Sequence, residues 1–259
     1  MNDTPETTVS PSTRHRTHAP IWLPVLMRSG YDAVRDNLLP FIGILTTAAL
    51  LVVVFYWWPA FRDSVTRLAE FKAQYGIVGS ALAAAVAGGL LPEIARTLFG
   101  RTKPVTRREQ FISIAFELTF FAVIGLIVDR LYVGLTFLYG GEPSVGTAVK
   151  KMLTDQFVFT PLVAIPLTLL AYRWRELGFD GRSLRRELSW DFVARRFLPM
   201  ALPNWFYWIP MNLLTYGLPT AAQFLLYLGA LAAWSLLLVV LAAERGRDTH
   251  DPLEAVAAP

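Results

Sequence analysis

Long apolar stretches alternate with short polar segments through most of this chain. Several of the apolar stretches approach or exceed about 18 residues, the length at which a helix can cross the hydrocarbon core of a bilayer. This pattern predicts an all-α fold, a multi-pass transmembrane helical bundle with about six membrane segments. The segments are expected at residues 38–58, 76–98, 111–137, 155–172, 197–218 and 220–243.

The fifth segment, residues 197–218, contains Pro199, Pro203 and Pro210. A proline has no N–H to donate inside a helix, so we expect this segment to be broken. A broken segment can cross the membrane or enter and leave on one side, and both arrangements stay open here. The two arrangements place the C-terminus on opposite sides of the membrane.

The polar regions complete the predicted organisation. We expect residues 1–37 to form a disordered or interfacial tail, residues 38–243 a single transmembrane domain, and residues 244–259 a polar tail. Residues 61–75 and 184–192 have apolar side chains at helical spacing, which indicates short helices lying on the membrane surface. With six spans, most arginines fall on the side that holds both termini, in agreement with the positive-inside tendency.

The composition excludes several classes of chemistry. Hydrophobic residues make up 54% of the chain, there is no cysteine, and the three histidines, His15, His18 and His250, lie in the tails. Thiol nucleophiles, histidine bases and His- or Cys-ligated metals are therefore not expected in the spans, and we expect neither an enzyme nor a bound cofactor. The net charge of +4 favours anionic lipid headgroups as partners. Nucleic acid is not expected, because acidic residues are interleaved with the arginines.

Ionisable and amide side chains inside the predicted spans are the main functional candidates. Each ionisable residue in a span costs roughly 2.5–3.5 kcal/mol on insertion scales, so it normally faces a partner or water. A different interpretation lets Asp129 and Arg130 reach the membrane interface or pair with neighbouring loops. The candidate pore- or cavity-lining residues are Glu117, Asp129, Lys150, Lys151, Asp155, Gln156, Asn204, Asn212 and Gln223.

Two patterns have more than one interpretation. Lys150 and Lys151 can anchor lipid headgroups while Asp155 caps a helix start, or they can form the polar mouth of a pathway with Asp155, and the two roles are compatible. A small residue also recurs every fourth position in the second segment. This stripe, which is typical of a close helix–helix contact, consists of Gly76, Ser80, Ala84 and Gly88.

Short motifs in the third to sixth segments resemble those of the Mpv-seventeen and peroxisomal 22-kilodalton membrane protein family. The sequence K-K-M-L-T-D-Q-F-V-F-T-P, which begins at Lys150, matches one motif, and Gly125 with Tyr132 and Asn204 with Trp208 match two others. The resemblance covers residues 68–243 and identifies the chain as a divergent member. The matching structural positions are Gly125, Tyr132, Pro161, Trp208, Pro210, Pro219 and Trp234.

The resemblance implies a function, because members of this family are described as weakly selective channels of mitochondrial and peroxisomal membranes. Together with the polar side chains in the spans, it predicts a channel for small polar or ionic solutes. A membrane scaffold without transport activity and an alternating-access carrier are the alternatives. Assembly into a homo-oligomer stays open. We expect a bacterial cytoplasmic membrane first, because no clear presequence is present, with the mitochondrial inner or peroxisomal membrane as alternatives.

Overall fold

The computed structural model describes residues 35, 38–98 and 106–248. Across these residues the chain forms helices joined by short connections, and no strand occurs in them. The elements are α2 (Leu38–Trp57), α3 (Pro59–Gln74), α4 (Gly76–Ala84), η1 (Ala85–Leu90), α5 (Leu91–Leu98), α6 (Arg107–Tyr139), α7 (Val145–Thr154), η2 (Asp155–Ala164), α8 (Ile165–Glu176), α9 (Gly181–Glu187), α10 (Trp190–Tyr216) and α11 (Thr220–Asp248). The elements η1 and η2 are π-helical turns within longer helices.

The predicted all-α membrane bundle is confirmed. Of the described helices, 5 are long and apolar enough to cross a membrane. These spans are Leu38–Trp57, Gly76–Leu98, Arg107–Tyr139, Val145–Glu176 and Thr220–Val239. The short helix expected at residues 61–75 is present as α3. The expectations for residues 1–34, 36–37 and 249–259 lie outside the described part of the chain.

The predicted fifth segment differs from the expectation. Residues 197–218 fall mostly within α10, a continuous helix of 27 residues that runs through its three internal prolines and does not meet the criteria for a span. The spacing of Pro199, Pro203 and Pro210 by four and seven residues places all three on one face of the helix. Hydrogen bonds are therefore lost along that face only, and those of the opposite face keep the helix continuous.

The fourth span begins earlier than predicted. Ser144 caps the start of α7 by accepting a hydrogen bond of 3.1 Å from the Thr147 N–H, and α7 continues into η2 and α8. Lys150 and Lys151 therefore lie on a helix and not in a connecting segment before it. Asp155 is likewise in the middle of the span and does not cap its start.

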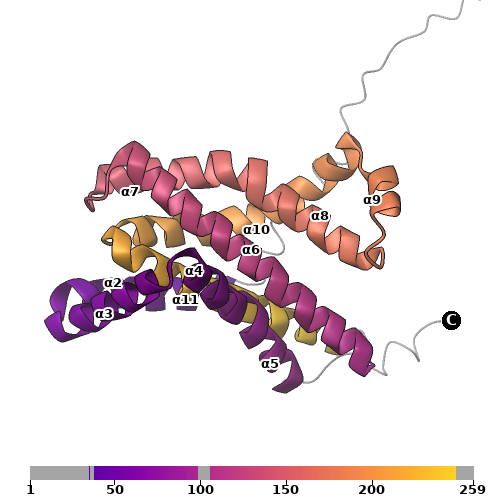
Figure 1. The fold of residues 1–259 in the computed structure, drawn as a ribbon, viewed down its shortest axis with the longest axis horizontal. Helices are drawn as coiled ribbons and strands as arrows, with labels where there is room; N and C mark the ends of the chain where they lie inside the picture. Colours follow the sequence, from indigo (N-terminus) through magenta and orange to yellow (C-terminus); the bar gives the residue numbers. More distant parts are fainter. Residues whose placement is uncertain (1–34, 36–37, 99–105, 249–259) are drawn as a thin grey trace, which may run out of the picture.

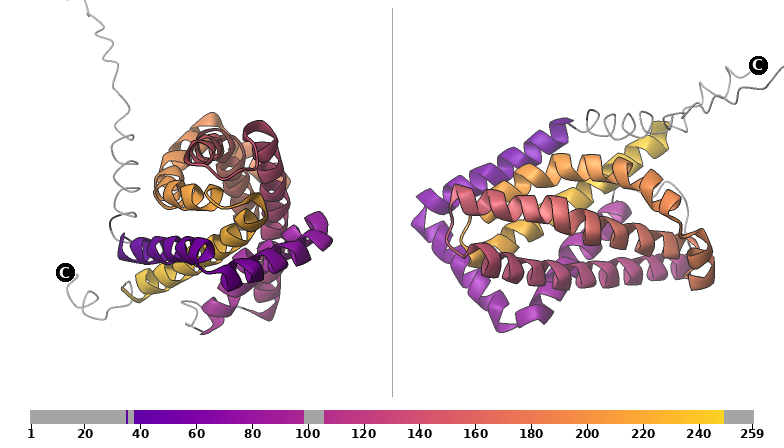
Figure 2. Two further views of the ribbon diagram at one scale, coloured as in Figure 1. Left: turned by 90° about the vertical axis from the view of Figure 1, so that its left-hand side faces the viewer. Right: turned by 90° about the horizontal axis from the view of Figure 1, so that it is seen from above.

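The helices pack around α6 and α10. Helix α6 contacts α4 and η1 on one side and α7 on another, while α10 contacts α7, η2, α8, α2 and α11. Figure 1 shows α6 crossing the molecule between the α2–α5 region and the helices α7 to α10. In Figure 2, α7 and α8 form one long helix that runs beside α10. The central apolar cluster includes Tyr132 and Leu135 of α6, Met152 of α7, and Phe224 and Tyr227 of α11.

The small-residue stripe is a helix–helix contact within the chain. Ser80 and Ala84 are 0% exposed and face α6, where a Cβ on Gly125 would lie 2.5 Å from the Ala84 Cβ and 2.7 Å from the Ser80 carbonyl oxygen. A Cβ on Gly88 would likewise collide with the Phe121 ring. Only Gly76 falls outside the contact, since it is exposed and joins α3 to α4 with a φ of 52°. The close approach of α4–η1 to α6 explains this part of the stripe.

This contact predicts a difference between two glycines of α6. Gly125→Ala should lower the free energy of unfolding by about 1–3 kcal/mol, because the new methyl group overlaps Ala84 and the Ser80 backbone. Gly134→Ala is the matched control, because a Cβ there meets nothing within 4 Å. It should be neutral or slightly stabilising, since alanine favours helix. Denaturation of the purified full chain in detergent measures both, and equal effects of the two substitutions would contradict the proposed packing.

Candidate functional site

A group of buried polar side chains lies around Asp155, at the junction of α7 and η2. Its Oδ2 accepts hydrogen bonds from the Tyr216 hydroxyl at 2.5 Å and from Asn212 Nδ2 at 3.0 Å. Its Oδ1 accepts from Gln156 Nε2 at 3.1 Å and from the Thr160 hydroxyl at 3.5 Å. Asp155 and its four donors are all buried. In the described residues no cation lies in ion-pair contact with this carboxyl, so neutral donors alone hold it.

A second layer follows deeper along η2 and α10. Gln156 Oε1 accepts from Asn204 Nδ2 at 3.4 Å, and the backbone carbonyl of Gln156 accepts from Trp205 Nε1 at 2.9 Å. Asn204 and Trp205 belong to the proline-containing part of α10. The contact therefore joins two segments whose backbone hydrogen bonding is altered, because η2 contains Pro161 and has π-helical geometry.

A third layer lies one helical turn from Asp155 in the other direction, toward the α6–α7 connection. Lys151 donates from Nζ to the Thr136 hydroxyl at 3.2 Å. Lys151 is buried, whereas the neighbouring Lys150 is exposed. Gln223 of α11 is also buried and donates from Nε2 to the Leu218 carbonyl at 2.8 Å.

Together these layers form a line of polar side chains that we call the polar seam. It lies between α6, α7–η2, α10 and α11, and aromatic rings surround its middle. The ring of Tyr132 lies 5.4 Å from that of Tyr216 and 6.0 Å from that of Tyr227. The members of the seam are Thr136, Lys151, Gln223, Tyr132, Asp155, Asn212, Tyr216, Gln156, Thr160 and Asn204.

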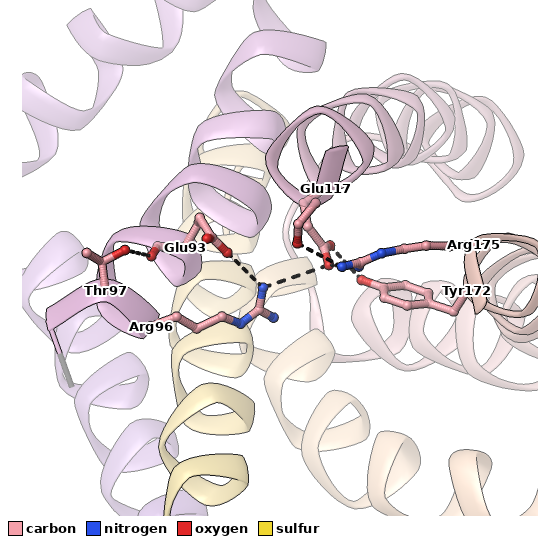
Figure 3. Close-up of polar contacts among 7 residues, drawn as sticks. Glu93, Arg96, Thr97, Glu117, Tyr172 and Arg175 are labelled. Carbon is pink, nitrogen blue, oxygen red and sulfur yellow. Dashed lines mark hydrogen bonds and ion pairs between the residues drawn. The ribbon is translucent and has the colours of Figure 1, made fainter. Parts of the chain in front are cut away.

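Glu117 lies in a separate network at the other end of α6, which Figure 3 shows in close-up. Its Oε1 accepts from Arg175 Nη1 at 2.9 Å and lies 3.9 Å from Arg96 Nη1, and its Oε2 accepts from the Tyr172 hydroxyl at 2.7 Å. Arg96 also pairs with Glu93 at 3.2 Å. The network joins α5, α6 and α8, and it balances two carboxylates with two guanidinium groups.

Asp129 lies in a third network. It accepts from Lys72 Nζ at 2.6 Å and from the Ser80 hydroxyl at 2.5 Å through Oδ1, and from Arg130 Nη2 at 2.6 Å through Oδ2. Lys72 also lies over the Phe224 ring, 4.3 Å from its centroid. Asp129 therefore pairs with other groups of the protein, as one interpretation expects, but its partners lie on helices and not in loops. Lys72 and Arg130 both compensate the charge of Asp129.

The structure brings together only some of the candidate lining residues. Lys151, Asp155, Gln156, Asn204, Asn212 and Gln223 belong to the polar seam, whereas Lys150 is exposed beside it. Glu117 and Asp129 lie on α6 about 18 Å apart, at ~1.5 Å per residue, and each has its own partners. The three carboxylates therefore do not share one hydrated centre in this structure.

Sequence reasoning missed the neutral members of the site. Tyr216, Thr160 and Thr136 bond the seam residues, and Tyr172 bonds Glu117, yet none was a lining candidate. A hydroxyl inside an apolar run carries no charge, so it gives no signal of an insertion cost. Helical spacing could have suggested Tyr216, because it lies four residues after Asn212. Thr160 lies five residues after Asp155, a spacing that comes within bonding distance in the π-helical segment η2.

The positions that resemble the family motifs are mostly packing residues. Gly125 allows the α4 contact, and Pro161 lies inside η2. Trp208 packs 5.9 Å from the Tyr227 ring, and Trp234 packs 4.8 Å from the Tyr207 ring. Pro219 precedes the first residue of α11. Pro210 lines an apolar cavity of about 140 Å³ between α2 and α10, on a different side of α10 from the Asp155 contact.

The Glu117 network predicts a stability difference between two acidic residues. Glu117→Gln should lower the free energy of unfolding by about 1–3 kcal/mol, because the substitution weakens the bonds to Arg175 and Tyr172 at a site where Glu117 is 3% exposed. Glu176→Gln, which removes an exposed pair with Arg173, should change it by less than about 1 kcal/mol. Thermal and denaturant unfolding of the two variants measure this, and a larger loss for Glu176→Gln would contradict it.

Among the described residues, no group of three or more histidine, cysteine, aspartate or glutamate side chains is placed to hold a metal ion. Comparisons with protein-family models, with characterised proteins and with solved structures give no match to the chain. The resemblance to the Mpv-seventeen family therefore stays a prediction. The polar seam and the two ion-pair networks are the features of the described residues that bear on function.

Proposed function

We propose that this membrane protein is a weakly selective channel for small polar or ionic solutes, and that the polar seam is its path. The observation that supports the proposal is the arrangement of the seam itself. Buried polar side chains from α6, α7–η2, α10 and α11 follow one another from Lys151 to Thr160. These residues span about 14 Å along the helix axis, at ~1.5 Å per residue.

Energetic cost favours a functional role for the seam. A helical bundle in lipid can be held together by apolar packing and small residues, as α4 and α6 are. Asp155 and Lys151 add an insertion cost of roughly 2.5–3.5 kcal/mol each, and neither forms an ion pair in the described structure. Intramembrane ionisable groups of this kind are typical of solute and ion pathways.

The structure corresponds, on this proposal, to a closed state. Most of the seam side chains are buried and bonded to one another, so a solute path requires water to replace those bonds. Helix α10 is the element best suited to move, because Pro199, Pro203 and Pro210 remove hydrogen bonds from one of its faces. A displacement of α10 from η2 would separate Asn204 and Asn212 from their partners on that element.

The scaffold alternative receives less support. One sequence feature that favours it is the small-residue stripe, and α6 covers Ser80, Ala84 and Gly88 of this stripe within the same chain. A carrier remains a close variant of the channel, since the fourth span and α10 together contribute most of the seam. We further propose, from the motif beginning at Lys150 and the positions Gly125, Tyr132 and Trp208, that the chain is a divergent member of the Mpv-seventeen family. A bacterial cytoplasmic membrane is the proposed location, and no catalytic role is proposed.

The channel proposal predicts a conductance that depends on Asp155. In planar bilayers the purified full chain should produce discrete conductance steps, and Asp155→Asn should change the unitary conductance by roughly 2- to 10-fold through one altered hydrogen-bonding group. Asn204→Ala is a second seam variant at a half-buried site, in case Asp155→Asn does not fold. Asp129→Asn is the matched control, because Asp129 is a buried carboxylate outside the seam.

The same measurement separates the alternatives. Silent bilayers containing protein that unfolds cooperatively would support the scaffold and overturn the channel. Saturable uptake into liposomes without conductance steps would support the carrier. A change produced equally by Asp129→Asn and Asp155→Asn would exclude the polar seam as the path.

A further inference from the structure

Lys151 has an unusual environment for a charged side chain. The residue is 1% exposed, and its ammonium group makes one hydrogen bond, to the neutral Thr136 hydroxyl at 3.2 Å. In the part of the chain that the structure describes, it has no ion pair. An ammonium group has three N–H donors, so two of them lack a protein partner. A buried charge normally requires a counter-charge.

Gln223 is a second buried residue with an unsatisfied polar group, and here the group is an acceptor. The residue is 1% exposed, and its Nε2 donates to the Leu218 carbonyl at 2.8 Å. Its Oε1 has no hydrogen-bond partner, and it is the sole buried side-chain nitrogen or oxygen of the described residues for which this holds. Unsatisfied buried polar atoms are rare in folded proteins and often indicate a missing ligand or water.

Helix register places these groups in one layer. Lys151 precedes Asp155 by four residues, and Gln223 precedes Tyr227 by four. Helices α7 and α11 both begin beside the α6–α7 connection, as the Thr220 hydroxyl bond to the Gly141 carbonyl shows, and both run away from it. Lys151 and Gln223 therefore both lie one turn from the layer of Asp155, Tyr216, Tyr132 and Tyr227. Thr136, already bonded to Lys151, belongs to the same layer.

The chemistry of this layer fits an anion better than a cation. It offers a positive charge, two spare N–H donors and a hydroxyl, and helix register places the unpartnered Gln223 Oε1 at the same level of the bundle. The nearest carboxyl in the seam, Asp155, has both oxygens occupied by four donors and has little capacity left to coordinate a cation. A water molecule could satisfy the hydrogen bonds but would leave the charge of Lys151 uncompensated.

We infer that Lys151, Thr136 and Gln223 form a binding site for a small oxyanion, the carboxylate or phosphate group of a permeating solute. Lys151 and Thr136 donate to its oxygens, and Gln223 Oε1 accepts from a protonated oxygen of the anion or from a water that accompanies it. This inference rests on the proposed function, because it makes the layer the point at which the path selects its solute. The oxyanion could also be the phosphate of a lipid headgroup, which offers the same chemistry.

Binding can be measured separately from conduction. We expect inorganic phosphate to raise the melting temperature of the full chain, purified in an uncharged detergent, in a saturable way. Lys151→Gln should abolish this rise, whereas Lys150→Gln should leave it intact, because Lys150 is the exposed neighbour of the same charge. Gln223→Leu, which removes one acceptor, should weaken the apparent affinity roughly 2- to 10-fold.

Each variant is compared with itself in chloride of equal ionic strength, so a change in its basal stability does not affect the result. If Lys151→Gln misfolds, Thr136→Val provides the second test, and it should also weaken the phosphate response. Equal losses in the two lysine variants, or a phosphate response that Lys151→Gln leaves unchanged, would overturn the site. A Lys151-dependent rise with phosphatidylglycerol, competing with phosphate, would support the site with a lipid headgroup as the source.

The two proposals fail in different ways. A Lys151-dependent phosphate response with silent bilayers would retain the oxyanion site and overturn the channel. Conductance steps without any phosphate response, and with an unchanged reversal potential in Lys151→Gln, would retain the channel and overturn the oxyanion site.

Discussion

A carboxyl group inside a bundle of apolar helices has to be satisfied by the protein itself, because lipid offers no hydrogen bond. This constraint explains how the fourth span and α10 meet. Asp155 receives Tyr216 and Asn212 from α10, and Gln156 receives Asn204 from the same helix. Helix α10 is not apolar enough to count as a span of its own, and these bonds help to hold it beside the fourth span. The hydrogen bonds of one acidic residue thus contribute, with apolar contacts to α2, α8 and α11, to the position of the proline-containing helix.

Charge compensation follows two different rules in this molecule. Glu117 and Asp129 face cations from other elements, Arg175 and Lys72, at 2.9 Å and 2.6 Å. Such pairs are costly to break and join helices that are distant in sequence. Asp155 and Lys151 lie four residues apart, at the spacing of a helical ion pair, yet each is held by neutral groups. Ionisable residues of the polar seam thus have neutral partners, whereas those of the Glu117 and Asp129 networks form ion pairs.

The sequence predicted the helical class and about six membrane segments, five of which correspond to the spans, because long apolar runs follow directly from transfer energies. It also named Asp155 and Gln156 as polar candidates, and both are buried in the structure. It did not predict α10 as a continuous helix. Each proline was treated as a break, and their shared face became evident only from the helix geometry. The pairing of Glu117 with Arg175 was also beyond it, since these residues are 58 positions apart and belong to different helices. Local sequence patterns indicate helical periodicity and the free-energy cost of inserting a polar residue into the membrane. Which side chains on different helices bond to each other depends on tertiary packing.

Helix α6 has a further property that concerns the surrounding bilayer. With 33 residues it is about 50 Å long, well beyond the ~30 Å of a typical hydrocarbon core. The helix must therefore tilt or extend into the headgroup region, and its tilt has to follow the thickness of the membrane. Glu117 lies about 15 Å from the start of this helix, at ~1.5 Å per residue, and Thr136 of the seam lies near its other end. Because α6 is one continuous helix, a change of tilt in a thinner or thicker membrane moves the Glu117 network and Thr136 together. The length of the lipid chains therefore affects the positions of both.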